Sequence, residues 1–359
     1  MCHQLYCLCI PPRFHLKPRA NIHVSSMWRF ALIVTLASAA VPTVFAWGDG
    51  LAHPVIGELA QTLLSAKGRQ LVESLVDPKY EGSLGGQTCN WADYWRFNHR
   101  NTGPWHFVDM NATPPSKCGY SPEDCADGNC IIGALTAQTY QLLNTKCEKS
   151  INNTHALQFI AHFIGDVTQP LHTVGRDIGG NSDHVKFDGR TTNFHAIHDA
   201  HIPDKRAEEV GAGKDARAYA GFLANLYGSK AEIYASRKYV DLVAMDTYGN
   251  LKAAINMAVD SNVLDCSSTG FWNLYDEDPA QDFGKTYYEV VKLPLEEQIA
   301  KLAAWINAIA DQCLNDYSST ANASPQSPAV PIIVPQNRQV DWATPSARNW
   351  KLRRALAPN

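Results

Sequence analysis

The stretch "HFIGDVTQPLH", residues 162–172, decides the fold and points to its chemistry. It continues a run over 154–167 in which apolar residues recur three and four apart, the spacing of a helix with a buried face. His162 and Asp166 are four residues apart, so on a helix they share one face. Pro170 ends or bends that helix and brings His172 in from another direction. A histidine and an aspartate on one helix are often only a solvated pair, but with a third donor after the kink they can also hold a metal ion.

Most of the chain shows the same helical periodicity, and alternation with period two is nearly absent. We therefore predict an all-α fold, a single multi-helix domain with long loops over 77–127 and 173–216, where Gly, Asn and Asp gather. The 359 residues, 45% of them apolar, are enough for one such core. The expected helical segments are 53–76, 130–144, 154–167, 217–238, 251–264 and 295–314.

Neither end of the chain is expected to join this core. Residues 27–46 have a basic residue, an apolar run and small residues before the cleavage position, as in a signal peptide. The apolar run is shorter than the ~20 residues of a membrane span. Residues 1–26 precede this signal and are expected to come from a mispredicted start codon. Residues 318–359 form a low-complexity tail rich in Ser, Ala, Pro and Asn, which leaves 47–317 as the domain.

Cysteines and sequons agree with secretion. Cleavage after Ala46 leaves seven cysteines, and in a secreted chain most of these form disulfides, with at least one unpaired because the number is odd. Asn111, Asn152 and Asn322 each begin an Asn-x-Ser/Thr sequon and are candidate glycosylation sites on exposed loops. The protein is expected to be extracellular and monomeric, with no stable membrane association.

The charge of the mature chain excludes one class of function. The whole chain has 31 basic and 35 acidic residues, and cleavage removes four basic ones, which leaves a formal net charge of −8. Such a chain is not expected to hold nucleic acid on a broad basic surface. It can still hold phosphate through bound metal ions, which bring positive charge of their own.

A second histidine–aspartate pair follows the first. In "FHAIHDAHI" His195 and Asp199 are again four residues apart. Two such pairs within 38 residues are hard to explain as solvent-exposed pairs without a function. His198 and His201 lie off that face, and we do not expect them to bind a metal ion.

Two aromatic motifs upstream supply further donors. "WADYWR" contains Asp93 with Arg96 one turn away, and "WHFVD" contains His106 and Asp109. Among aromatic residues these polar groups are expected to be partly buried and to need partners. Each one alone is explained as well by a hydrogen-bonded core residue as by a functional one.

The predicted mature N-terminus adds the last donors. In "AWGDGLAH" cleavage frees the amine of Trp47, which can chelate a metal ion together with its own carbonyl, and His53 follows after a Gly-rich turn. One zinc ion needs only three or four donors, so the complete set suggests three metal ions, with Asp166 bridging two of them. Such clusters are suited to the hydrolysis of phosphate esters. The candidate ligands are Trp47, His53, Asp93, His106, His162, Asp166, His172, His195 and Asp199.

The combined motifs resemble the zinc-dependent single-strand-specific nucleases of fungi and plants, the S1/P1 nuclease family, which is related in fold to the bacterial zinc phospholipases C. The resemblance covers about residues 47–316. It includes the Trp-Gly start, the four histidine- and aspartate-containing motifs above, "GGN" at 179–181 and the closing "KLAAWINAIAD". Each motif alone is weak, and their combination is specific.

The resemblance implies a role for each of these residues. Asp93, His106, His162 and Asp166 match one zinc site; His172, His195 and Asp199 match a second; Trp47, His53 and Asp166 match the third. Arg96 matches the arginine that stabilises the phosphate, and Asp109 the carboxylate that orients the attacking water. Phe107 and Ile178 match the pair that sandwiches a base, and Asn181 the residue that reads the base edge. For Phe107 and Ile178 the alternative is plain core packing.

The resemblance also implies disulfides, and this chain departs from the family in three places. Cys125–Cys130 and Cys118–Cys266 are the pairs implied, while Cys89, Cys147 and Cys313 cannot be assigned. His53 comes one residue later than the family's first histidine, His198 replaces an aromatic residue, and "GGN" continues with "SDH".

The expected function is a secreted endonuclease and 3′-nucleotidase with three zinc ions, which cuts single-stranded DNA and RNA at the 3′-O–P bond and leaves 5′-phosphate products. A phospholipase C on the same fold is one alternative, and a non-catalytic zinc-binding secreted protein is another.

Overall fold

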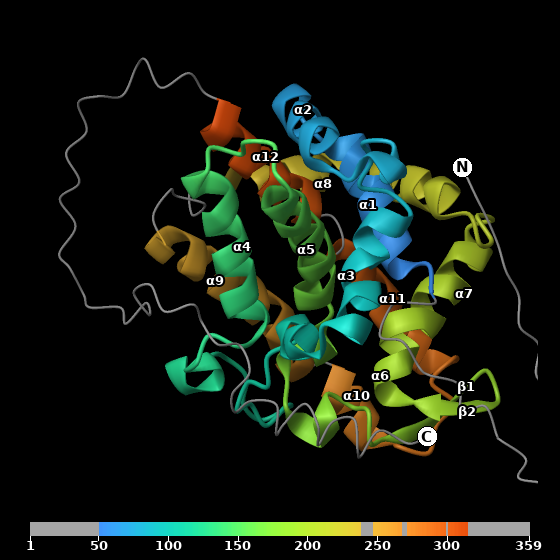
Figure 1. The fold of residues 1–359 in the computed structure, drawn as a ribbon. Coiled ribbons are helices and arrows are strands. Elements are labelled where there is room, and N and C mark those ends of the chain that lie inside the picture. The colour runs from blue at the N-terminus through green and yellow to red at the C-terminus, as the bar shows by residue number, and fades with distance from the viewer. Residues whose placement is uncertain (1–49, 238–246, 268–270, 299–300, 315–359) are drawn as a thin grey trace, which may run out of the picture. The chain divides into compact units, whose positions relative to one another are not determined.

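The computed structural model describes residues 50–237, 247–267, 271–298 and 301–314, which all belong to one compact unit. This part of the chain is mainly α-helical, as predicted (Figure 1). The α-helices are α1 Ala52–Leu63, α2 Ala66–Leu75, α3 Gln87–Asn98, α4 Ile131–Asn144, α5 Ile151–Thr168, α6 Phe194–Ala196, α7 Ile202–Glu209, α8 Ala216–Arg237, α9 Thr247–Cys266, α10 Phe271–Glu277, α11 Thr286–Gln298 and α12 Lys301–Leu314.

Helix α5 lies at the centre of the fold, between α4 on one side and α3 on the other (Figure 1). It begins after Ser150, whose side chain accepts a hydrogen bond from the backbone N–H of Asn153 and so satisfies one donor of the first turn. It ends at Thr168, where Pro170 cannot continue the helix. Residues 156–168 are all buried, so the polar residues among them are enclosed by protein on every side.

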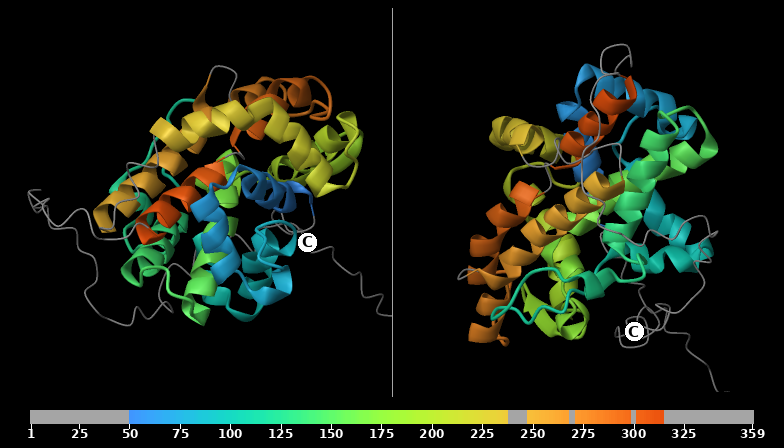
Figure 2. Two further views of the ribbon diagram at one scale, coloured as in Figure 1. Left: turned by 90° about the horizontal axis from the view of Figure 1, so that it is seen from above. Right: turned by 90° about the vertical axis from the view of Figure 1, so that its left-hand side faces the viewer.

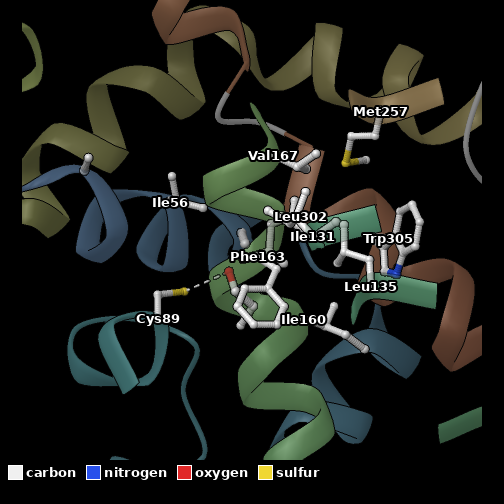
Figure 3. Close-up of a cluster of buried hydrophobic side chains, with 14 of the residues drawn as sticks. Ile56, Cys89, Ile131, Leu135, Ile160, Phe163, Val167, Met257, Leu302 and Trp305 are labelled. Carbon is white, nitrogen blue, oxygen red and sulfur yellow. Dashed lines mark hydrogen bonds between the residues drawn. The ribbon is translucent and has the colours of Figure 1, made fainter. Parts of the chain in front are cut away.

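The hydrophobic core surrounds α5. Figure 3 shows Ile160, Phe163 and Val167 of α5 meeting side chains of α4 and α12. Helix α8, yellow in Figure 2, packs on α1 and α12, and α9 packs on α4 and α5. The polar end of α5 is thereby held in a rigid apolar setting.

Two segments predicted as loops differ from the structure. The segment 77–127, predicted as loop, contains α3 as well as the short 3-10 helices η1 Pro78–Tyr80, η2 Arg100–His106 and η3 Pro122–Cys125. The segment 173–216 contains η5 Arg176–Ile178, α6, the π-helical turn η6 Ile197–His201 and α7, and η4 Pro170–Thr173 ends at its start. Both segments are therefore loops only in part, and the prediction missed the helices within them.

The segment 173–216 also contains a β-hairpin, the two-stranded sheet of the described residues. Strands β1 His184–Phe187 and β2 Arg190–Asn193 pair antiparallel, with His184 opposite Asn193 and Phe187 opposite Arg190. Asp188 and Gly189 form the turn, and both have positive φ angles, as a tight two-residue hairpin turn requires.

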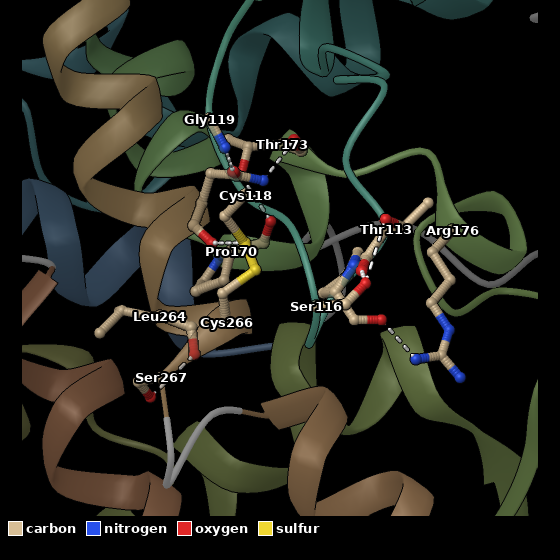
Figure 4. The surroundings of a disulfide bond; sticks show 12 residues. Thr113, Ser116, Cys118, Gly119, Pro170, Thr173, Arg176, Leu264, Cys266 and Ser267 are labelled. Atoms are coloured by element: carbon tan, nitrogen blue, oxygen red, sulfur yellow. Dashed lines mark hydrogen bonds between the residues drawn. A yellow bond between two sulfur atoms is a disulfide. The ribbon is translucent and has the colours of Figure 1, made fainter.

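Three disulfides connect elements within the described residues. Cys118–Cys266 and Cys125–Cys130 are the pairs implied by the resemblance, and Cys118–Cys266 joins the segment after η2 to the end of α9 (Figure 4). The third, Cys147–Cys313, ties the chain after α4 to α12 and was not assigned from sequence. Cys89 is free and buried in α3, where its thiol lies 3.6 Å from the carbonyl oxygen of Ala161.

Several predictions fall outside the described residues, namely the segment 1–26, the signal peptide 27–46, Trp47, Asn322 and the tail 318–359. Asn111 and Asn152 are both exposed, although Asn152 lies in the first turn of α5 and not in a loop. None of the helices within the described ranges is both long and apolar enough to cross a membrane.

Candidate metal centre

All the histidines and aspartates predicted as ligands come together in three buried clusters. Trp47, the remaining predicted ligand, lies outside the described residues. In each cluster one ligand atom per residue lies within 4.8 Å of the others. The clusters are Asp93, His106 and His162; His172, His195 and Asp199; and His53, His162 and Asp166.

Asp166 lies between the clusters, as a bridging ligand would. Its Oδ2 atom is 2.9 Å from Nδ1 of His106 and 3.0 Å from Nε2 of His162. Its Oδ1 atom is 3.2 Å from Nε2 of His53. Burial raises the pKa of the Asp166 carboxyl, but the neighbouring histidines outweigh burial and hold it well below its usual value.

His53 reaches the site despite the additional residue before it. It lies in the first turn of α1 with no exposed surface, and its ring stacks on that of His162 with 3.9 Å between centroids. Gly165 makes this approach possible, because a Cβ atom at Gly165 would lie 2.8 Å from Nδ1 of His53. The shift in sequence therefore does not move His53 away from Asp166.

The second cluster is built where helical geometry changes. His195 is in α6 and Asp199 in the π-helical turn η6, and Nε2 of His195 lies 3.0 Å from Oδ2 of Asp199. His172 enters from η4, after the end of α5, with its Nε2 3.3 Å from Oδ1 of Asp199. Single π-turns within helices are frequent at functional sites. Burial opposes the charged form of His172, but Asp199 and Asp166 raise its pKa to about 9.

Backbone carbonyls orient three of the histidines. Nδ1 of His162 lies 2.6 Å from the carbonyl oxygen of Cys89, and Nδ1 of His195 lies 2.7 Å from that of Gly179. Nδ1 of His172 lies 3.1 Å from the carbonyl oxygen of His106. A carbonyl only accepts, so each Nδ1 carries the proton and each Nε2 presents its lone pair to the cluster. This is the usual support for a histidine that binds a metal ion.

The clusters are better suited to binding divalent cations than to hydrogen bonding among their own side chains. Three aspartates, Asp93, Asp166 and Asp199, are almost completely buried close to the imidazoles of the clusters. Oδ2 of Asp93 and Nε2 of His106 have no hydrogen-bond partner within the part of the chain that the structure describes. Burial of unpaired polar atoms is costly unless they bind a metal ion. Nitrogen and carboxylate donors in groups of three or four are the ligands that zinc takes in proteins.

The two other histidines of the motif are engaged elsewhere. Nδ1 of His198 donates to the carbonyl oxygen of Phe194, and its Nε2 lies 2.7 Å from the hydroxyl of Tyr287. Nε2 of His201 lies 3.1 Å from the hydroxyl of Thr192. Neither residue belongs to one of the three clusters.

Sequence reasoning missed Gln169. Its side-chain amide donates to Oδ1 of Asp199 at 2.7 Å, and its side-chain oxygen accepts from the backbone N–H of Leu171. It thereby orients a ligand of the second cluster and holds the turn that carries His172. The sequence offered little signal, because Gln169 is one of several polar residues around Pro170.

Of the two residues predicted to handle phosphate, Arg96 contacts a ligand of the first cluster and Asp109 lines a groove. Nη2 of Arg96 is 3.1 Å from Oδ1 of Asp93, and its charge contributes, after burial, to a pKa of His106 lowered to about 4. Asp109 lines an open groove of about 620 Å³ between the segment 109–116 and the turn 175–177. The Arg96 charge therefore lies next to a buried ligand, and the Asp109 carboxylate lies in the wall of the groove.

The residues predicted to bind a base are partly exposed. Phe107 directly follows η2, and Ile178 has the left-handed φ angle of 61°. Asn181 donates through Nδ2 to the carbonyl oxygen of Ile178 at 2.9 Å, which fixes the orientation of its amide.

Comparison with known proteins agrees with this geometry. A family model described as S1/P1 Nuclease matches residues 47–311. Nuclease S1 of Aspergillus oryzae is 30% identical over 289 residues, which cover 77% of this chain and 96% of the relative. Nuclease P1 of Penicillium citrinum is 31% identical over 277 residues, or 73% and 97% of the two chains. Endonuclease 2 of Arabidopsis thaliana is 36% identical over 193 residues, or 51% and 63%.

Proposed function

The chain belongs to the S1/P1 nuclease family and is a phosphodiester-hydrolysing enzyme, and from this premise we propose that it is a zinc-dependent endonuclease and 3′-nucleotidase acting on single-stranded DNA and RNA. One observation carries the proposal, the convergence of three buried histidine–aspartate clusters on Asp166. A phosphatidylcholine hydrolase would not need Phe107, Ile178 and Asn181 as base-binding residues, and a non-catalytic zinc protein would need neither Arg96 nor Asp109.

The three clusters would hold three zinc ions. Asp93, His106, His162 and Asp166 would hold one, and His172, His195 and Asp199 another. His53 and Asp166 would hold the third together with the amine and carbonyl of Trp47, which lies outside the described residues. Bound zinc ions would supply Lewis-acid stabilisation of the charge on the phosphoryl oxygens and lower the pKa of water in the site.

The neighbouring side chains have separate tasks. The Arg96 guanidinium donates hydrogen bonds to the oxygens of the scissile phosphate, and its planar fork suits that role. Asp109 accepts a hydrogen bond from the attacking water and orients it in line with the leaving oxygen. A bond forms between the water oxygen and phosphorus while the P–O3′ bond breaks. The products are a 3′-hydroxyl and a 5′-phosphate.

A base stacked between Phe107 and Ile178 accounts for the preference for single strands. A base can enter such a sandwich only when it is unstacked from its neighbours, which a duplex prevents. Stacking tolerates every base, since each has a π-face, and is worth ~1–3 kcal/mol per base. None of the assigned residues tests for a 2′-hydroxyl, so both RNA and DNA are substrates.

The protein acts as a secreted glycosylated monomer in this proposal. The three disulfides support an extracellular location, because such bonds persist in oxidising compartments. Asn111 and Asn152 are exposed, as glycan acceptors must be.

The test measures metal content and turnover on the secreted protein after sequencing of its N-terminus. We expect three zinc ions per chain beginning at Trp47, release of phosphate from a 3′-nucleotide, faster cleavage of single-stranded than of duplex DNA, and loss of both activities on chelation. Asp109→Asn should keep the metal content and lower kcat by ~10²–10⁴-fold. Hydrolysis of phosphatidylcholine without hydrolysis of a 3′-nucleotide, or zinc binding without any phosphoesterase activity, would contradict the proposal.

A further inference from the structure

The turn that carries the predicted base-binding residues has an unusual backbone. Asp177, Ile178, Gly179 and Gly180 have φ angles of 47°, 61°, 61° and 76° in succession. Glycine adopts this left-handed region readily, whereas aspartate and above all the β-branched isoleucine do so at a cost in free energy. Such a conformation persists only where the surroundings impose it, and it is a mark of functional sites.

The same turn also serves the metal centre. The carbonyl oxygen of Gly179 accepts from Nδ1 of His195, and that of Gly180 accepts from the backbone N–H of His195. These two hydrogen bonds hold the Gly179–Gly180 end of the turn to His195, independently of Arg176 at its other end.

Arg176, directly before the turn, anchors it to two other parts of the protein. Nη1 and Nη2 of Arg176 form a bidentate pair with the Asp276 carboxylate of α10, at 2.9 and 2.6 Å. The guanidinium lies 4.2 Å from the centroid of the buried Trp272 ring, also in α10. Nη1 donates in addition to the carbonyl oxygen of Pro114 at 2.7 Å, and Nε to Asp177 at 3.2 Å. Figure 4 shows the Arg176 side chain beside the segment that contains Thr113 and Ser116.

The two anchors are themselves joined to each other. Cys118, four residues after Pro114, is disulfide-bonded to Cys266 at the end of α9, and α10 packs against α9. Asn262 of α9 accepts from the backbone N–H of Gly119 and donates to the carbonyl oxygen of Thr173 (Figure 4). Arg176 therefore links the segment at Pro114 to α10, two parts that the disulfide and α9 also connect. Its charge is paired with the carboxylates of Asp276 and Asp177.

We propose that Arg176, held by Asp276 and Trp272 of α10, is a positioning residue that imposes the left-handed turn 177–180 and so sets the affinity of the enzyme for the base of its substrate. This inference rests on the proposed function, since it concerns the base-binding part of the same site. Arg176 acts through the turn and does not contact the reacting atoms.

The experiment compares Asp276→Asn and Arg176→Lys with the unaltered protein. The first keeps the shape of the partner but not its charge, and the second keeps the charge but not the planar fork. Two substrates are used, adenosine 3′-phosphate and the base-free ribose 3-phosphate. We expect KM for adenosine 3′-phosphate to rise about five- to tenfold in both variants, as the loss of a half-buried bidentate pair should cause, with kcat changed less than about twofold. Hydrolysis of ribose 3-phosphate should be unchanged. Calorimetry should show the same loss of affinity for adenosine 5′-phosphate.

The matched control is Arg217→Lys, which alters an exposed arginine paired with Glu58 and should change none of these quantities. Equal losses on the two substrates would show a general structural defect and overturn the inference, and so would an unchanged KM for adenosine 3′-phosphate. If the unaltered protein itself fails to hydrolyse adenosine 3′-phosphate, the proposed function falls and the inference with it. The unaltered protein therefore tests the function, and the ratio of variant to unaltered protein tests the inference.

Discussion

Gly165 is the residue on which the position of His53 depends. A methyl group at Gly165 would lie 2.8 Å from Nδ1 and 2.9 Å from Cε1 of His53, closer than carbon atoms come without a shift. We expect Gly165→Ala to displace His53 from Asp166 and to remove one bound zinc ion per chain. Overpacking of this kind costs ~1–3 kcal/mol of folding free energy. Metal content by mass spectrometry and unfolding in denaturant measure the two effects.

The matched control is the same substitution at Gly221 in α8, where an added Cβ would meet nothing within 4 Å. Alanine is favoured over glycine inside a helix by ~1 kcal/mol, so Gly221→Ala should stabilise the protein and leave its metal content unchanged. If the two variants behaved alike, the contact between Gly165 and His53 would not determine the third site.

Asp183, which follows the turn 177–180, makes the stability of the protein depend on pH. Burial, then the charge of Asp177, raises its pKa to about 6, although the Tyr275 hydroxyl and Arg176 act in the opposite direction. In the unfolded chain the pKa is ~3.9, so between about pH 4 and 6 the folded state holds a proton that the unfolded state has lost. The contribution of Asp183 to the free energy of unfolding therefore falls as the pH rises from about 4 to 6.

Asp183→Asn should remove this effect. Because Asp183 is only half-buried, we discount the shift for solvent screening and expect a gain of ~1 kcal/mol above pH 6. The gain should vanish near pH 4. Denaturation of both proteins in parallel at pH 4, 5, 7 and 8 gives the difference directly, and a gain that is constant over this range would refute the assignment.

Spacing in the sequence predicts some residues of the site and not others. His162 with Asp166, and His195 with Asp199, could be identified because helical periodicity places residues four apart on one face. The roles of Gly165 and Arg176 could not be, because each depends on a contact with a segment distant in the sequence. The ion pair from Arg176 to Asp276 spans 100 residues, and no local pattern encodes it.

At the scale of helices, a buried ionic cluster joins α7, α8 and α11. Glu296 of α11 accepts from Nε of Arg206 in α7 at 2.8 Å and from the hydroxyls of Tyr219 and Tyr227 in α8 at 2.7 and 3.2 Å. Its side chain is only 5% exposed. Arg206 also pairs with Glu209, so the arrangement leaves the arginine well compensated.

Glu296→Ala should therefore destabilise the protein by ~3 kcal/mol, the low end for a broken buried pair, because two tyrosine hydroxyls lose a buried acceptor while Arg206 keeps Glu209. The control is Glu289→Ala in the same helix, which removes a 63% exposed partner of Lys292 and should cost only ~0.2–1 kcal/mol. Denaturant unfolding at fixed zinc concentration measures both. Similar losses for the two variants would mean that Glu296 contributes no more than a surface charge.

The helices expected at 130–144, 154–167, 217–238 and 251–264 were predicted within a few residues. The segment expected as one helix at 53–76 is divided into α1 and α2, and the segment 295–314 contains the end of α11 as well as α12. Helix α3 and the hairpin were not predicted. Helix α3 reads "QTCNWADYWRFN", in which aromatic and polar residues obscure the periodicity, and its helical state depends on packing against α5 and α1. The hairpin did carry a local signal, Asp188–Gly189 between two short alternating runs. Its strands have only four residues each, too few for period two to stand out.

At the scale of the whole molecule, the candidate metal centre is built on the same helix that forms the middle of the hydrophobic core. Asp166 and His162 lie on the helix that forms the middle of the core, and the other ligands come from α1, α3, η2, η4, α6 and η6. Disulfides close the fold at other places, between Cys118 and Cys266 and between Cys147 and Cys313. Removal of the ions would leave buried carboxylates and imidazoles facing one another, which disfavours the folded state.

Stability should therefore depend on the concentration of free zinc, with a slope that counts the ions. A ligand that binds only the folded state stabilises it in proportion to the logarithm of its concentration, by ~1.4 kcal/mol per site for each tenfold increase. Three sites predict a slope of ~4 kcal/mol per tenfold increase in zinc, and two sites a slope of ~3 kcal/mol. Denaturant unfolding with intact disulfides in zinc buffers covering several decades measures this slope. In Gly165→Ala the slope should fall by the contribution of one site, while in Gly221→Ala it should not change. A stability that did not respond to zinc or to chelation would mean that the clusters are filled by hydrogen bonds alone, and the assignment of Asp166 as a bridging ligand would be wrong.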